Sequence, residues 1–125
     1  MHCVIETPDF GKSAKAEGLS ADDRHKLTTF ISDNPKAGVL IQGTGGARKL
    51  RFRKEGSGKS GGYRVITYFA AEDIPVFLLD IYSKGQKLNL SDAEKKEMKS
   101  ILGGIAKDYR QSMKEKVSEL AEKAS

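Results

Sequence analysis

The strongest constraint on the fold is a pair of apolar runs separated by two acidic residues. The runs read YRVITYFA, residues 63–70, and IPVFLLDIY, residues 74–82, and Glu72 and Asp73 stand between them. Both runs are rich in β-branched and aromatic residues, which favours strands. The second is apolar on both faces, as expected of a strand in the middle of a sheet. Together they predict a central β-hairpin.

Three further segments are strand candidates. The segment ARKLRFRK, residues 47–54, alternates and so predicts a strand with two different faces. One face carries Arg48, Leu50 and Phe52, and the other carries Lys49, Arg51 and Arg53. VLIQ, residues 39–42, is a short strand at best, and HCVIE, residues 2–6, reads as an edge strand.

Helix signals stand at both ends of the chain. Thr7 followed by Pro8 predicts a helix start, and Ser20 predicts a second start soon after Gly18. Asn34-Pro35 ends the second helix. Ser91 and Glu94 form a capping box before an amphipathic helix that continues to about residue 122.

That last helix is longer than the domain is wide. It would measure roughly 45–50 Å at 1.5 Å per residue, whereas a domain of this size is only about 30 Å across. Part of it must therefore project, bend at Gly103-Gly104 or pack on something else.

These elements predict an α+β fold. We expect a small antiparallel β-sheet, mainly a meander with helices on one side, two N-terminal helices packed on it and a long C-terminal helix. We expect residues 1–108 to form the domain and residues 109–125 a helical extension.

The positive charge of the chain is concentrated in one segment. The chain has 22 Lys and Arg against 17 Asp and Glu, a net charge of +5. Residues 47–64 contain seven basic residues and one acid, Glu55. This local excess is larger than that of the whole chain and is typical of a surface that binds a polyanion.

Metal, cofactor and membrane functions find no support in the sequence. Cys3 is the single cysteine, so a disulfide or a CxxC zinc site is not expected. No carboxylate cluster stands near the basic segment to bind Mg²⁺. No run approaches 18 apolar residues, and the N-terminus does not read as a signal peptide. We expect a cytoplasmic protein without metal or cofactor.

The glycine-rich segment EGSGKSGGYR, residues 55–64, contains GKS but is not a P-loop. A P-loop needs a glycine where Arg53 stands, and a helix must follow the loop. A strand follows here. We expect the segment to carry Lys59 toward a nucleic-acid backbone.

Antiparallel pairing of the hairpin would gather basic and aromatic residues at one edge of the sheet. The residues expected there are Arg51, Arg53, Lys54, Lys59, Arg64, Tyr82, Lys84 and Lys87. Arg64 admits two interpretations. It either forms an ion pair with Glu55 or Glu72, or it presents its planar guanidinium to a phosphate.

A surface rich in Lys, Arg and Tyr but poor in histidine suits RNA cleavage. RNA supplies its own nucleophile, the 2′-OH. The enzyme has to orient it, remove its proton, stabilise the phosphorane charge and protonate the leaving 5′-oxygen. A lysine among other cations has a lowered pKa and can act as a base, and an aromatic ring such as Tyr82 can stack on a nucleobase.

The motifs GTGGARKLRF, GKSGGYRVITYF and LLDIYSKGQKLNLSDAE, together with the opening ETPDF, resemble the RelE/ParE toxin superfamily, in particular its HigB-like branch. The resemblance covers about residues 6–107. It implies the toxin of a type II toxin–antitoxin system, a metal-independent endoribonuclease that cleaves mRNA in the ribosomal A site. The implied partners are the 70S ribosome, mRNA and an antitoxin from the same operon, expected to contain a helix-turn-helix.

The resemblance also implies roles for individual residues. Catalysis is expected of Lys54, Arg64, Tyr82 and Lys84. The resemblance and the basic segment together lead us to expect RNA or ribosome binding of Arg48, Lys49, Arg51, Arg53, Lys59 and Lys87. Which side chain is the general base stays open. Two other functions stay open as well: a ParE-like gyrase poison without RNase activity, and a non-toxic basic RNA-binding module.

Overall fold

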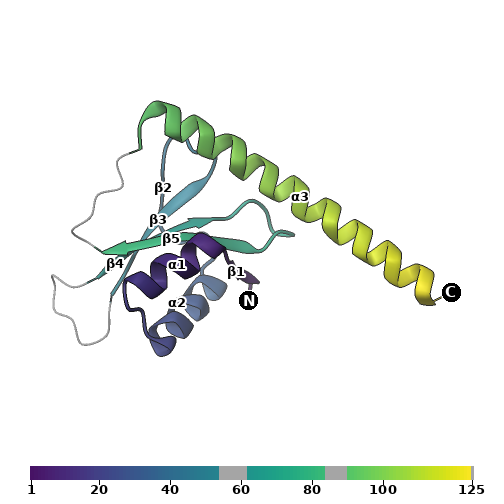
Figure 1. The fold of residues 1–125 in the computed structure, drawn as a ribbon, viewed down its shortest axis with the longest axis horizontal. Coiled ribbons are helices and arrows are strands. Elements are labelled where there is room, and N and C mark those ends of the chain that lie inside the picture. Colours follow the sequence, from purple (N-terminus) through teal and green to yellow (C-terminus); the bar gives the residue numbers. More distant parts are fainter. Residues whose placement is uncertain (54–61, 84–89, 125) are drawn as a thin grey trace.

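Five strands and three helices make up the described part of the chain, residues 1–53, 62–83 and 90–124, in the computed structural model. Their order is β1 (Val4–Glu6), α1 (Pro8–Ala16), α2 (Ala21–Asp33), β2 (Val39–Leu40), β3 (Ala47–Phe52), β4 (Tyr63–Tyr68), β5 (Val76–Ser83) and α3 (Asp92–Ala124). The α+β class, the two N-terminal helices and the long C-terminal helix are confirmed (Figure 1).

The strands form one sheet in the order β1-β5-β4-β3-β2. The segment from β2 to β5 is an antiparallel meander, as the hairpin pattern predicts. β1 differs, because it lies beside β5 in parallel, with Val4 opposite Val76. The sheet is therefore mixed. The direction of a three-residue edge strand depends on its distant partner, which its own residues do not encode.

Helices α1 and α2 cover one face of the sheet. Thr7 and Ser20 cap them, since their side-chain oxygens accept hydrogen bonds from the amides of Phe10 and Asp23. Phe10 is fully buried in the core beneath these helices. The rest of this core comprises Ala14, Leu27, Ile31, Tyr63, Val65, Val76, Leu78 and Ile81.

Helix α3 covers the opposite face, so the expectation of helices on one side only is wrong for this helix. Leu102 is buried against Ile66, Tyr68 and Phe77. Both faces of β4 and β5 are apolar, and each face needs a helix to exclude water from it. The sheet thus lies between two helical layers.

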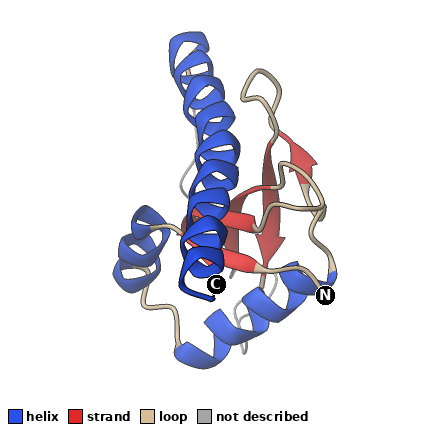
Figure 2. Cartoon of the chain, turned by 90° about the vertical axis from the view of Figure 1, so that its right-hand side faces the viewer, coloured by secondary structure: helices blue, strands red, loops and turns tan. Residues whose placement is uncertain are grey.

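Helix α3 is a single unbroken helix of 33 residues, about 50 Å long. It begins at the predicted capping box, where Ser91 and Glu94 exchange hydrogen bonds of 3.2 Å. The helix does not break at Gly103-Gly104 (Figure 2), and its C-terminal half extends beyond the sheet (Figure 1). The Arg110 guanidinium forms an ion pair with Asp73 at 2.8 Å, which ties the middle of α3 to the β4–β5 connection. Of the three possibilities for this helix, projection is the one observed.

None of the helices in the described ranges combines the length and the apolarity that a membrane crossing requires.

Candidate functional site

Three of the predicted site residues form a row across the middle of the sheet. Arg51 on β3 lies directly opposite Arg64 on β4, and Arg64 lies directly opposite Tyr82 on β5. Side chains in such positions share one face and have Cβ atoms about 4.5–5.5 Å apart. The pairing register thus brings two guanidinium groups and one phenol together. We call these three residues the Arg–Arg–Tyr row.

The Arg–Arg–Tyr row lies on the face that α3 covers, but at the other end of the strands. Helix α3 packs near Ala47 at the start of β3 and Tyr68 at the end of β4. The row stands at the end of β3, the start of β4 and the end of β5. The row is accessible, with Arg51 exposed and Arg64 and Tyr82 half-buried.

The backbone that carries Arg64 is held firmly from the other face. Its neighbours Tyr63 and Val65 are buried in the core beneath α1 and α2. β4 is also hydrogen-bonded to strands on both sides. The backbone of Arg64 is therefore fixed by its neighbours, and rotation of the side chain alone sets the position of the guanidinium.

The electrostatics of the row favour an anionic ligand. Like charges directly opposite each other on neighbouring strands destabilise a sheet. Among the described residues, neither Arg51 nor Arg64 has a carboxylate partner, and Glu72 instead pairs with Lys36 at 3.8 Å. The expected alternative of an Arg64–Glu72 ion pair is thus wrong, whereas Glu55 lies outside the described residues. A guanidinium group without a carboxylate partner can bind a phosphate bidentately.

Tyr82 is protonated at neutral pH. Burial raises the pKa of its phenol above the ordinary value, the nearby Arg64 charge lowers this pKa, and Asp80 raises it. The first effect is the largest. The phenol of Tyr82 can therefore donate a hydrogen bond or offer its ring to a base at pH 7.

The pKa of Tyr82 provides a test of the row. Arg64 favours the tyrosinate because opposite charges attract, so Arg64→Gln should raise the pKa of Tyr82 further. The measurement is a pH titration of the tyrosine ring carbons by NMR. Arg110→Gln, which removes an arginine outside the row, is the control and should leave the Tyr82 titration in place. An unchanged pKa in Arg64→Gln would show that the two side chains do not approach each other.

The remaining predicted residues are distributed unevenly. Lys49 is exposed on the face of the row, opposite Ile66, and Arg53 is exposed just beyond β3. Arg48 lies on the other face, where its guanidinium donates a 2.9 Å hydrogen bond to the Lys36 carbonyl. The structure does not bring Arg48 into this site. Four predicted residues lie outside the described residues: Lys54, Lys59, Lys84 and Lys87.

One contact next to the row had no counterpart in the sequence analysis. The carboxylate of Glu17, just past the end of α1, accepts hydrogen bonds from the Ser83 amide at 3.2 Å and from the Ser83 hydroxyl. The Tyr63 hydroxyl donates to the Glu17 carbonyl at 3.4 Å. These bonds fasten the end of β5, next to Tyr82, to α1. Glu17 and Ser83 are 66 positions apart, and no local pattern links them.

Among the described residues, His2 lies away from the Arg–Arg–Tyr row. The ring of His2 contacts the Ile74 carbonyl at 2.6 Å and packs near Phe69, far from the row in the sheet. Within the described ranges, His, Cys, Asp and Glu form no group of three or more that would suit a metal ion.

Comparison with known proteins gives one family match. The model of the RelE toxin of the RelE/RelB toxin–antitoxin system matches residues 3–125. Among solved structures, a mutant of the E. coli toxin RelE in the free state is 16% identical, with a TM-score of 0.44. The match covers 64% of this chain and 80% of that one. At this identity and TM-score, the structural likeness adds nothing to the family match.

Proposed function

The chain belongs to the RelE toxin family, and from this membership we propose that it is a ribosome-dependent endoribonuclease that cleaves mRNA in the A site. Family membership makes it the toxin of a toxin–antitoxin pair and implies an antitoxin as its partner. We also propose that the chain acts in the cytoplasm, on mRNA bound to the ribosome. Its antitoxin is proposed to contain a helix-turn-helix, and the chain itself is proposed to belong to the HigB-like branch.

The observation that carries this proposal is the Arg–Arg–Tyr row. Two arginines without a carboxylate partner among the described residues stand opposite each other on central strands. A sheet that needed only stability would avoid this pair. A site that stabilises a phosphate with growing negative charge would use it, because a preorganised guanidinium needs little rearrangement during the reaction.

The proposed reaction is attack of the 2′-OH on the adjacent phosphodiester. The 2′-oxygen forms a bond to phosphorus, and the bond to the 5′-oxygen breaks, which leaves a cyclic phosphate and a free 5′-OH. A base takes the 2′-OH proton, and an acid gives a proton to the 5′-oxygen. Arg64 stabilises the equatorial oxygens of the phosphorane, and Arg51 supports it from the next strand.

The other residues have proposed roles in proton transfer and binding. Lys54 and Lys84 are the proposed proton-transfer groups, and Tyr82 stacks on a base or donates a hydrogen bond. Phosphate contacts on the ribosome or the mRNA are assigned to a wider basic set, which contains Lys49, Arg53, Lys59 and Lys87. Each such contact releases counterions, so this binding should weaken as the salt concentration rises.

Induction in a bacterial host tests the proposed function. Growth should stop, and newly formed mRNA ends should map inside translated frames, because the cleavage site is on the ribosome. The measurement is sequencing of RNA ends before and after induction. Growth arrest with intact mRNA and an induced DNA-damage response would instead support a gyrase poison. Normal growth with intact mRNA would support a non-toxic RNA-binding module.

A further inference from the structure

The C-terminal half of α3 has an apolar stripe that faces solvent. Met113, Val117 and Leu120 are 43%, 59% and 61% exposed. Their spacing of four and then three residues places them on one side of the helix. A helix with a solvent-facing apolar stripe has a surface that a partner can bury.

The charges of this helical segment are arranged around the stripe. Successive residues turn by about 100° around the helix axis. Lys114 and Lys116 therefore lie on the two sides of Val117, whereas Glu115 and Glu119 lie on the opposite side of the helix. The stripe thus has lysines along its edges and the glutamates away from it. Its natural complement is an apolar surface with an acidic border.

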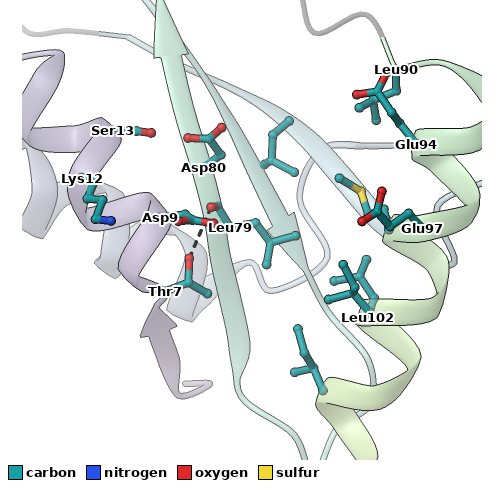
Figure 3. Close-up of a pocket in the computed structure, with 14 residues that line it drawn as sticks. Thr7, Asp9, Lys12, Ser13, Leu79, Asp80, Leu90, Glu94, Glu97 and Leu102 are labelled. Carbon is teal, nitrogen blue, oxygen red and sulfur yellow. Dashed lines mark hydrogen bonds between the residues drawn. The ribbon is translucent and has the colours of Figure 1, made fainter.

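The same chain has a groove of that kind. It lies along the edge of β5 at Leu79 and Asp80, past the last residue that pairs with β1, with α1 on one side and the first half of α3 on the other (Figure 3), and its volume is about 620 Å³. Its apolar walls include Ile66, Met98 and Ile101. Ile101 is 56% exposed, so part of its side chain is available to a partner.

The border of the groove is acidic although the chain as a whole is basic. Asp9 comes from α1, Asp80 from β5, and Glu94 and Glu97 from α3 (Figure 3). Lys12 is the one cation among the described residues that line the groove. Four carboxylates around an apolar floor favour a helix with lysines beside an apolar stripe.

We propose that the C-terminal half of α3 from one copy of the chain binds in the α1–α3 groove of a second copy. Within one chain this contact does not form, because α3 is continuous and its first half is already a wall of the groove. Between two copies the exchange is reciprocal, as a two-fold dimer requires. Because the helix–groove contact forms twice in such a dimer, the buried surface is twice that of one contact. Specific interfaces bury roughly 1,200–2,000 Å² in total.

Sedimentation velocity of the full chain, without RNA or ribosomes, tests this dimer. We expect a dimer whose fraction rises with concentration. Val117→Glu combined with Leu120→Glu should weaken association at least about 100-fold, because each removes a central apolar contact. Gln111→Glu combined with Ser118→Glu adds the same charge on the other side of the helix and should leave the dimer intact.

Charge exchange identifies the occupant of the groove. Glu94→Lys with Glu97→Lys, and separately Lys114→Glu with Lys116→Glu, should each weaken self-association. A mixture of these two variants should form a mixed dimer, because the acidic helix of one variant meets the lysine-bordered groove of the other, while the second contact keeps its wild-type charges. Circular dichroism confirms that each variant is folded.

Three outcomes would overturn the proposal. The first is a chain that stays monomeric at about 200 μM, far above the Kd range of specific interfaces. The second is a dimer that the stripe variants do not weaken. The third is a monomeric chain whose groove becomes protected from hydrogen exchange only when the antitoxin is added. Since none of these readouts involves cleavage, the dimer and the nuclease proposal succeed or fail separately.

Discussion

Arg64→Ala should lower the rate of mRNA cleavage by about 10²–10³-fold, the usual loss when one preorganised charge-stabilising contact is removed. The reason is the position of Arg64, in the middle of the Arg–Arg–Tyr row and on a strand that is buried on its other face. Arg64→Lys should recover little of the rate, because a lysine lacks the planar fork that contacts two phosphate oxygens. The measurement is single-turnover cleavage of mRNA on programmed ribosomes.

Two controls separate catalysis from folding. Thermal unfolding of Arg64→Ala should stay close to that of the wild type, since Arg64 has no ion pair among the described residues. Arg110→Ala removes an arginine at the middle of α3, outside the row, and should cleave at a near wild-type rate. Near wild-type cleavage by Arg64→Ala would show that the catalytic assignment is wrong. An Arg64→Ala chain that is unfolded at room temperature would show that Arg64 has a structural role.

Phe10→Ala should destabilise the fold by about 3–5 kcal/mol, the usual cost of truncating a buried aromatic side chain. Phe10 is fully buried, and it connects α1 to the core formed with α2, β4 and β5. The total stability of a domain is only about 5–15 kcal/mol. This variant should therefore lose a large part of its folded population under mild denaturing conditions.

Urea unfolding followed by circular dichroism measures this loss. Phe30→Ala makes the same substitution on α2, where the ring is 44% exposed. This substitution should lower the free energy of unfolding by less than about 1 kcal/mol, because the Phe30 ring is only partly buried. Equal losses in the two variants would show that burial beneath α1 does not determine the stability of this layer.

Local sequence patterns were reliable wherever a structure depends on neighbouring residues. Thr7, Ser20 and Ser91 accept hydrogen bonds at the helix starts where they were expected. The hairpin of β4 and β5 and the alternation in β3 also follow from short-range periodicity. The rule that antiparallel partners meet at one edge predicts Tyr82 close to Arg64, and the pairing register agrees.

Contacts between distant segments could not be predicted in this way. The parallel pairing of Val4 with Val76 depends on how the chain crosses space between them. The packing of α3 on the second face of the sheet depends on Leu102 reaching Ile66 and Phe77. Two faces of one apolar strand look alike in sequence, and nothing local shows which helix covers which face.

The sequence by itself determined the elements, the basic segment and the identity of the arginine and tyrosine residues that could act on a phosphate. The alternation in β3 already predicted that Arg48 and Arg51 face opposite sides, but the tertiary structure alone decided the register that aligns Arg51, Arg64 and Tyr82 in one row and the contact of Arg48 with the Lys36 carbonyl. It also decided that Glu17 holds Ser83. The physical reason is that propensity and periodicity arise within a few residues along the chain, whereas register and helix packing arise from burying apolar surface across the whole fold.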